Sequence, residues 1–202
     1  MSTTEEAPAA VVQGTGIADP APLGLAAFAL TTFLLSASNA GLMKSATGAA
    51  FLGYAFAYGG LGQLLAGMWE FRNRNVFGAT AFSSYGAFWI GLGLWAELAH
   101  APAAAKDVGW ILLAFAIFNT YMLIFSSQLN MAVFLVFLTL ELTEIFLFIG
   151  ILGGNANIVK VGGVIGIITA LVAWYTSAAG VINGMKGKPV FPVGGPLFNL
   201  GG

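Results

Sequence analysis

Two glutamates, Glu141 and Glu144, lie three residues apart near the middle of a long apolar run. On a helix this spacing places both carboxyl groups on neighbouring parts of one face. A charge at that depth of a membrane costs about 2.5 to 3.5 kcal/mol on insertion scales. Two carboxylates so close are not both ionised in a dry site, so we expect at least one to carry a proton. The pair is a candidate proton site, either in a proton-coupled or carboxylic-acid-conducting path or in a neutral hydrogen bond between helices.

Polar side chains on the preceding apolar run are candidate partners for these carboxyl groups. Asn119, Thr120 and Tyr121 stand together in that run. An amide, a hydroxyl and a phenol can each donate a hydrogen bond to a carboxyl oxygen. The sequence alone does not join them, but they are the partners to look for.

An aromatic stripe runs along the segment from 77 to 96. Phe82, Tyr85 and Trp89 follow one another at i, i+3 and i+7, which places them on one face of a helix. A stripe of this kind is usually packed into the core of a helix bundle. The specific alternative is a pore constriction, where a tyrosine hydroxyl and ring edges face a path that excludes hydrated ions and admits a small, partly apolar solute.

A helix predicted from Asp19 to Leu42 positions further polar groups. Asp19 can cap the first free amides, and Pro20 suits the first helical position because its missing donor is not needed there. The uncharged stretch that follows is about 22 residues long, enough to cross roughly 30 Å of hydrocarbon. A ring, a hydroxyl and an amide share one face of it, which we expect to avoid lipid, at Phe28, Thr32, Leu35 and Asn39.

Composition places the whole chain in a bilayer. Of its 202 residues, 58% are hydrophobic and 7% are charged, and the mean hydropathy is +0.89. An average soluble domain has about 25% charged residues. Seven basic and eight acidic residues leave no basic patch to attract nucleic acid. With no cysteine and one histidine, neither a disulfide framework nor a metal site is predicted, and no motif calls for a cofactor.

Cutting the chain at its charged and glycine-asparagine positions leaves five further apolar runs. They lie at about 49 to 69, 77 to 96, 108 to 128, 130 to 152 and 160 to 184. The prediction is an all-α membrane protein, a bundle of six transmembrane helices over residues 19–184. A disordered N-terminal tail precedes it at 1–18, and a C-terminal tail follows it at 185–202.

Basic residues beside the spans set the expected orientation. Four lie on the side of the N-terminus and three on the other side: Arg72, Arg74, Lys186 and Lys188, against Lys44, Lys106 and Lys160. Because basic residues favour the cytoplasmic side, this excess predicts that both termini are cytoplasmic. Glu70 is expected to form interfacial ion pairs with the two arginines that follow it.

Glycines recur at intervals that favour close helix contacts. Gly53, Gly60 and Gly67 are spaced seven apart in the second run, and Gly162 and Gly166 form a GxxxG pair in the last. Helices approach one another closely at such small residues in lipid. We assign both patterns to packing, within or between subunits.

Four stretches, in order along the chain, carry a family resemblance. They are DPAPLGL at 19–25, followed by Thr31-Thr32 and Asn39-Ala40-Gly41; FGATAFSSYGAFW at 77–89; Gly154-Asn155-Ala156; and FPVG at 191–194. The first two are similar to the signatures NPAPLGL and FGxTAFxSYGxFW. On these motifs the chain resembles the acetate uptake transporter family, of the succinate-acetate permease type.

The resemblance implies a six-helix protein of the cytoplasmic membrane, with both termini inside, that assembles as a homohexamer with a path through each protomer. The family cargo is acetate, with succinate and other short carboxylates in some members, and both proton symport and anion-channel behaviour are described. The family's hydrophobic constriction corresponds to Phe28, Tyr85 and Leu140. Asp19 replaces the usual asparagine and adds a negative charge at a possible anion entrance. We expect the path to include Thr31, Thr32, Leu35, Asn39, Trp89 and Asn119.

Two classes of function remain open. The first is a transporter or channel for acetate and related short carboxylates, in which an ammonium or small neutral solute channel is the alternative because a narrow aromatic constriction also fits such cargo. The second is a non-transporting membrane receptor or assembly subunit, whose polar residues only hold helices together. No motif for ATP hydrolysis or zinc proteolysis is present, so no enzyme activity is predicted.

Overall fold

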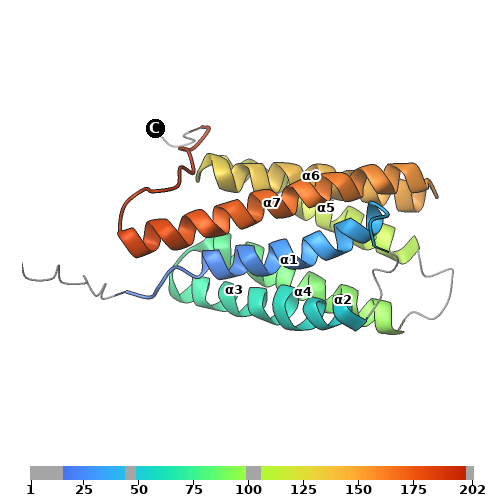
Figure 1. Ribbon diagram of the computed structural model, residues 1–202, viewed down its shortest axis with the longest axis horizontal. Coiled ribbons are helices and arrows are strands. Elements are labelled where there is room, and N and C mark those ends of the chain that lie inside the picture. Colours follow the sequence, from blue (N-terminus) through green and yellow to red (C-terminus); the bar gives the residue numbers. More distant parts are fainter. Residues whose placement is uncertain (1–15, 44–48, 99–105, 199–202) are drawn as a thin grey trace, which may run out of the picture.

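The computed structural model describes residues 16–43, 49–98 and 106–198, and within these ranges every regular element is a helix (Figure 1). Most of the predicted N-terminal tail lies outside the described residues. The elements in chain order are α1 (Ala21–Asn39), α2 (Ala49–Tyr54), the π-helical η1 (Ala55–Gly62), α3 (Gln63–Arg72), α4 (Val76–Leu98), α5 (Asp107–Ser126), α6 (Met131–Leu152) and α7 (Ala156–Lys186).

Four of these helices, α1, α5, α6 and α7, are long and apolar enough to cross a membrane. The segments α2, η1 and α3 follow one another without a break, and α4 has 23 residues. The prediction of an all-helical, multi-pass membrane protein is therefore confirmed over the described ranges. The count of six spans stays a prediction.

Helices α1 and α7 each begin beside a side chain that accepts hydrogen bonds from the first free amides of the helix. Asp19 Oδ1 accepts a hydrogen bond from the Ala21 amide at 2.9 Å, although Pro20 is the N-cap residue and not, as predicted, the first helical residue. Such one-residue differences are common at helix ends. Asn155 accepts from the amides of Asn157 and Ile158, so α7 begins at Ala156, before the predicted position 160.

The helices form two groups joined by α1 (Figure 1). One group is α5, α6 and α7, in which α6 packs against both of its neighbours, and the other is η1, α3 and α4. Helix α1 packs on α7 on one side and on η1 and α3 on the other. The start of α1, the α3–α4 turn and the end of α7 meet at one end of the bundle, which we call the N-terminal end.

The predicted close contacts of the glycine stripe are confirmed at Gly60 and Gly67 but not at Gly53. Gly60 lies against Ile90 of α4, and Gly67 lies against Ser83, so both occupy close helix contacts. Gly53 faces open space and is exposed. The π-helix η1 begins after Gly53 and includes Gly60. Its turns contain more residues than those of an α-helix, so a seven-residue spacing does not hold both glycines on one face.

The GxxxG pair packs within this chain. Gly162 faces Leu147 of α6, and Gly166 lies between Ser36 of α1 and Thr143 of α6. These contacts let α7 approach both α1 and α6 closely, which fixes α1 at the centre of the bundle.

The C-terminal tail folds back on the bundle. Asn183 Oδ1 accepts from the amides of Val190 and Phe191, and Tyr175 donates to the Pro192 carbonyl at 2.6 Å. The Ala132 amide, in the first turn of α6, donates to the Val193 carbonyl. The segment containing FPVG thus ties the end of α7 to the start of α6.

Candidate functional site

Three cavities follow one another along α1. The widest, about 220 Å³, opens at the end of α1 that contains Leu35 and Asn39, and we call it the vestibule. Next comes a cavity of about 30 Å³ that is lined in part by Glu144, and we call it the polar cavity. The third, about 20 Å³, lies closer to the N-terminal end among Leu25, Gln63 and Val136, and is here the apolar cavity.

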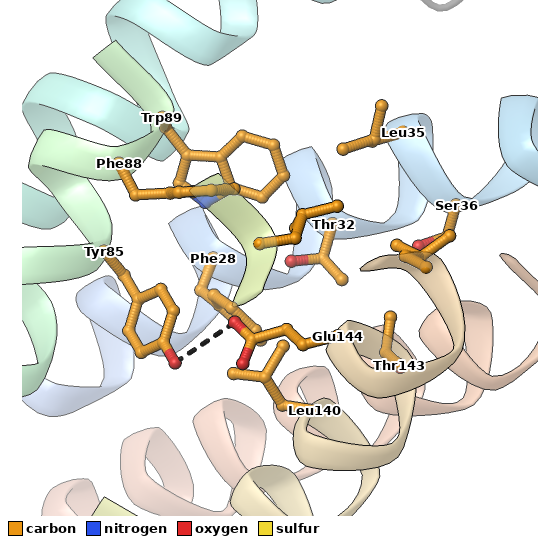
Figure 2. Close-up of a pocket in the computed structure, with 12 residues that line it drawn as sticks. Phe28, Thr32, Leu35, Ser36, Tyr85, Phe88, Trp89, Leu140, Thr143 and Glu144 are labelled. Atoms are coloured by element: carbon orange, nitrogen blue, oxygen red, sulfur yellow. Dashed lines mark hydrogen bonds between the residues drawn. The ribbon is translucent and has the colours of Figure 1, made fainter. Parts of the chain in front are cut away.

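Among the described residues, three side chains line both the polar and the apolar cavity: Phe28, Tyr85 and Leu140. They come from α1, α4 and α6, and each is buried. The Phe28 and Tyr85 rings meet edge to face, with centroids 5.8 Å apart. Figure 2 shows these three side chains pointing toward one another. They therefore separate the two cavities, at the positions predicted for the constriction.

The predicted faces of α1 and α4 line the cavities. Phe28, Thr32 and Leu35 line the polar cavity, and Leu35 and Asn39 line the vestibule. On α4 the aromatic stripe passes from the apolar cavity at Phe82 to the polar cavity at Trp89. A single face of each helix thus follows the whole series of cavities.

Two residues expected on the path line none of the three cavities. Thr31 is fully buried and its hydroxyl donates to the Ala27 carbonyl, while its side chain packs against Gly59 of η1. One residue along a helix turns the side chain by about 100°, which points Thr31 away from the face of Thr32. Asn119 is also fully buried and lies behind Tyr85, in contact with the phenol and outside the linings of the three cavities.

Asn119 is the centre of a hydrogen-bond network between α4, α5 and α6. Its Nδ2 donates to the Phe137 carbonyl at 3.0 Å and to Glu141 Oε2 at 2.7 Å. Its Oδ1 accepts the Tyr85 hydroxyl at 3.0 Å. The amide therefore fixes Tyr85 relative to α6.

The two glutamates have different surroundings. Glu141 is half-buried on the outer side of α5 and α6, and its Oε1 accepts from the Thr120 hydroxyl at 2.9 Å. Glu144 is buried and lines the polar cavity, with Oε1 3.4 Å from the Tyr85 hydroxyl oxygen (Figure 2). The predicted partners Asn119 and Thr120 are thus confirmed, but for Glu141 alone.

Several side chains that line the polar cavity carry a buried polar atom with no hydrogen-bond partner among the described residues. These atoms are Thr32 Oγ1, Trp89 Nε1 and Glu144 Oε2. Buried polar groups in native structures are almost always paired, with protein, water or ligand. Among the described residues, side chains around the polar cavity carry three such atoms, against one each around the vestibule and the apolar cavity, at Trp95 and Gln63.

Sequence reasoning missed two buried polar side chains. Gln63 is 1% exposed and lines the apolar cavity, where its Oε1 has no partner among the described residues. An amide inside a glycine-rich apolar run was the signal that could have found it. Glu70, beyond the predicted span, is buried and accepts from Asn73, not from an exposed arginine as predicted, and burial raises the pKa of its carboxyl.

A family model described as the GPR1/FUN34/yaaH family matches residues 2–193. A solved structure of the bacterial acetate channel SatP superposes with a TM-score of 0.83 at 35% identity, covering 89% of this chain and all of that one. The succinate-acetate/proton symporter SatP of Escherichia coli is 38% identical over 186 residues, 89% of this chain and 97% of the relative.

Fungal relatives are longer than this chain. Acetate permease A of Emericella nidulans is 39% identical over 201 residues, 90% of this chain and 67% of the relative. Ammonia transport outward protein 2 of Saccharomyces cerevisiae is 37% identical over 173 residues, 81% of this chain and 61% of the relative. This chain therefore spans nearly all of the bacterial relative and about three fifths of the yeast one.

Proposed function

Because the chain belongs to the GPR1/FUN34/yaaH family, a family of membrane transport proteins and not of enzymes, we propose that it carries acetate and related short carboxylates. The observation that carries the proposal is that Phe28, Tyr85 and Leu140 are the only described side chains shared by the polar and apolar cavities. A solute moving along α1 passes between these three. Relatives named for acetate transport support this cargo.

The chemistry of the constriction suits a small carboxylate. Two ring edges and a leucine offer no replacement for the water shell of an inorganic ion, so a hydrated ion is excluded. Acetate presents a methyl group to such a surface, and its carboxylate finds polar groups on one side of the constriction, at Thr32, Trp89 and Glu144. Longer carboxylates, including succinate, belong to the proposed substrates as the larger and less favoured ones.

Proton coupling is part of the proposal and rests on Glu141 and Glu144. One amide, Asn119, links Glu141 to the Tyr85 hydroxyl, and that hydroxyl lies beside Glu144. The two carboxyl groups are thus connected through the constriction residue itself. A proton held at one of them is positioned to accompany a carboxylate anion along the path.

We further propose six spans, a homohexamer, and a location in the cytoplasmic membrane with both termini inside. Support for the orientation is that α1 begins and α7 ends at the same end of the bundle (Figure 1). Support for assembly is that Glu141 and Thr120 lie at mid-depth on an outer face, where exposure to lipid costs free energy. A neighbouring protomer would cover them. Asp19 then caps α1 at the cytoplasmic mouth.

Uptake by purified protein in liposomes tests the proposal. Labelled acetate, succinate and methylammonium are supplied in turn, and protein-free liposomes are subtracted because acetic acid crosses bare lipid. We expect saturable acetate uptake that exceeds succinate uptake and rises with an inward proton gradient. Acetate uptake no greater than in protein-free liposomes would favour the receptor or assembly subunit.

Ammonium or a small neutral solute is the second candidate cargo. A relative named for ammonia transport and the narrow aromatic constriction both support it. Methylammonium uptake that exceeds acetate uptake in the same assay would select it. We favour the carboxylate because the unpartnered Trp89 Nε1 can only donate a hydrogen bond, which suits an oxygen acceptor and not an ammonium ion.

A further inference from the structure

The side-chain amide of Asn119 is held in one orientation by two acceptors on α6. Its Nδ2 lies 3.0 Å from the Phe137 carbonyl oxygen and 2.7 Å from Glu141 Oε2. The amide has two hydrogens on Nδ2, one for each acceptor. Turning the amide over would place Oδ1 against the Phe137 carbonyl with no hydrogen between the two oxygens. Helix α6 therefore fixes the amide, and its Oδ1 faces Tyr85 of α4.

The single proton of the Tyr85 hydroxyl goes to this amide oxygen. Asn119 is fully buried, so its Oδ1 needs a donor, and the phenol oxygen lies 3.0 Å away. Among the described residues, a second acceptor of the phenol is Glu144 Oε1, at the longer distance of 3.4 Å. A phenol has only one proton to donate, and the shorter contact takes it. Glu144 is therefore the competing acceptor.

The hydrogen bond from Tyr85 to Asn119 joins the two groups of helices. Tyr85 belongs to α4, which packs mainly on η1 and α3, whereas Asn119 belongs to α5, which packs mainly on α6. The Tyr85 ring also contacts the rings of Phe88, Phe115 and Phe118, with centroids 5.6 to 6.4 Å away. These apolar contacts restrict the ring, and the amide fixes the hydroxyl at its tip.

Losing the amide would direct the phenol toward the proposed path. Glu144 lines the polar cavity, and Tyr85 and Leu140 lie between that cavity and the apolar one. A phenol released from Asn119 would donate to Glu144, whose carboxyl group lies opposite the hydroxyl (Figure 2). That contact would link α4 to α6 beside the boundary between the cavities. The bond to Asn119 thus holds Tyr85 back from Glu144.

We propose that Asn119 and Glu141 are positioning residues for Tyr85, which hold the phenol in the orientation in which the constriction conducts. The inference rests on the proposed transport function and assigns different roles to the two glutamates. Glu141 is half-buried on the outer side of α5 and α6 and lines none of the three cavities. It therefore acts on a solute only through Asn119 and Tyr85. In the proposed proton coupling, Glu144 is then the residue that carries the proton.

Saturable acetate uptake by the full-length protein in liposomes tests the positioning role. Asn119→Leu and Glu141→Leu each remove a hydrogen bond of the amide and should lower the maximal rate about fivefold, the effect of one lost hydrogen bond. Glu141→Gln keeps an oxygen that can accept from Asn119 Nδ2. It should conduct like the wild type and remain stimulated by an inward proton gradient. Thr139→Val is the matched control, because the Thr139 hydroxyl bonds to carbonyls of its own helix.

A second background separates positioning from a general loss of structure. Tyr85→Phe has no hydroxyl for Asn119 to hold, so adding Glu141→Leu to it should cause no further loss of uptake. A role of Glu141 in packing alone would lower uptake by the same factor in both backgrounds. The melting temperature in detergent checks that each variant is folded.

The hydrogen bond of Tyr85 can also be followed without transport. The chain has five tyrosines, so labelling their Cζ atoms with ¹³C gives few NMR signals, and the signal of Tyr85 is the one that Tyr85→Phe removes. Glu141→Leu should shift this signal, because the phenol changes its acceptor. Glu141→Gln and Thr139→Val should leave it in place.

Two results would refute the inference. One is that Glu141→Gln loses as much uptake as Glu141→Leu, because Glu141 would then act through its own proton. The other is that Glu141→Leu lowers uptake equally with and without the Tyr85 hydroxyl. A wild type without saturable acetate uptake would instead contradict the transport proposal, and the Tyr85 signal would still decide whether Asn119 and Glu141 hold the phenol.

Discussion

The polar and apolar cavities lie on either side of the same three side chains but differ in their chemistry. Side chains that line the polar cavity carry a carboxyl oxygen, a hydroxyl and an indole nitrogen that are buried without a partner among the described residues. The apolar cavity is lined by aliphatic and aromatic groups with a single amide, Gln63. In the proposed transport function, recognition of the solute and the barrier to its passage are therefore assigned to adjacent but separate cavities. Under the proposed transport function, a carboxylate meets polar side chains on one side of this boundary and an apolar stretch on the other.

The largest effect is expected when the boundary between the two cavities is removed, because the difference between them depends on it. Phe28→Ala joins the two cavities and should cost about 3 to 5 kcal/mol of stability, since a buried ring is lost from a close-packed core. The surviving protein should take up succinate relative to acetate at a higher ratio than the wild type. The uptake ratio in liposomes measures this, and an unchanged ratio would place the barrier elsewhere.

Displacing one helix tests whether the cavities depend on its position. Gly60→Leu forces η1 away from Ile90 of α4, and overpacking of this kind costs about 1 to 3 kcal/mol. Gly53→Leu is the matched control, because Gly53 faces open space. We expect a clear fall in the detergent melting temperature for Gly60→Leu alone. Equal effects at both positions would mean that Gly53 also lies in a contact, for example with a neighbouring protomer.

The hydrogen bond of Tyr85 can be removed without changing the size of the boundary between the cavities. Tyr85→Phe keeps the ring but leaves Asn119 Oδ1 buried without its donor, at a cost of about 1 to 3 kcal/mol. Acetate flux should fall, while the ratio of acetate to succinate uptake stays close to that of the wild type. A shift in that ratio as large as the one in Phe28→Ala would show that the hydroxyl contributes to size selection.

The smallest effect is expected in the apolar cavity. Gln63→Leu removes a buried amide whose Oε1 has no partner among the described residues, so the detergent melting temperature should hold or rise slightly. Acetate flux should stay within about threefold of the wild type, which is below 1 kcal/mol. If Gln63→Leu loses as much acetate flux as Tyr85→Phe, the apolar cavity also binds the carboxylate. The proposed difference in chemistry between the two cavities would then be wrong.

Helical periodicity in the sequence predicts much of the site. Side chains three or four apart align on a helix, so the sequence places Phe28, Thr32 and Leu35 on one face, and they do line one cavity. Asn119 and Thr120 are recognisable as partners of a carboxyl because an isolated acid in an apolar helix requires one. Patterns that depend on one regular helix are thus readable from the sequence.

What the sequence does not reveal depends on contacts between helices or on irregular backbone. The π-helical turns of η1 break the phase of the Gly53 stripe, and no residue pattern announces them. Thr31 and Thr32 are equivalent as a motif, and only the position of η1 turns Thr31 into packing. The different surroundings of Glu141 and Glu144 follow from contacts with other helices, and Tyr85, which contacts Glu144, lies more than 50 residues away in the chain.

Acetate flux through a protein blocked at the boundary is the most direct test of the path. Leu140→Trp fills the junction between the cavities, and Leu142→Trp is its control on the same helix because Leu142 is exposed. With both variants folded in liposomes, we predict that Leu140→Trp reduces saturable acetate uptake to the level of protein-free liposomes, while Leu142→Trp conducts like the wild type. Wild-type uptake in folded Leu140→Trp would contradict a path between Phe28, Tyr85 and Leu140.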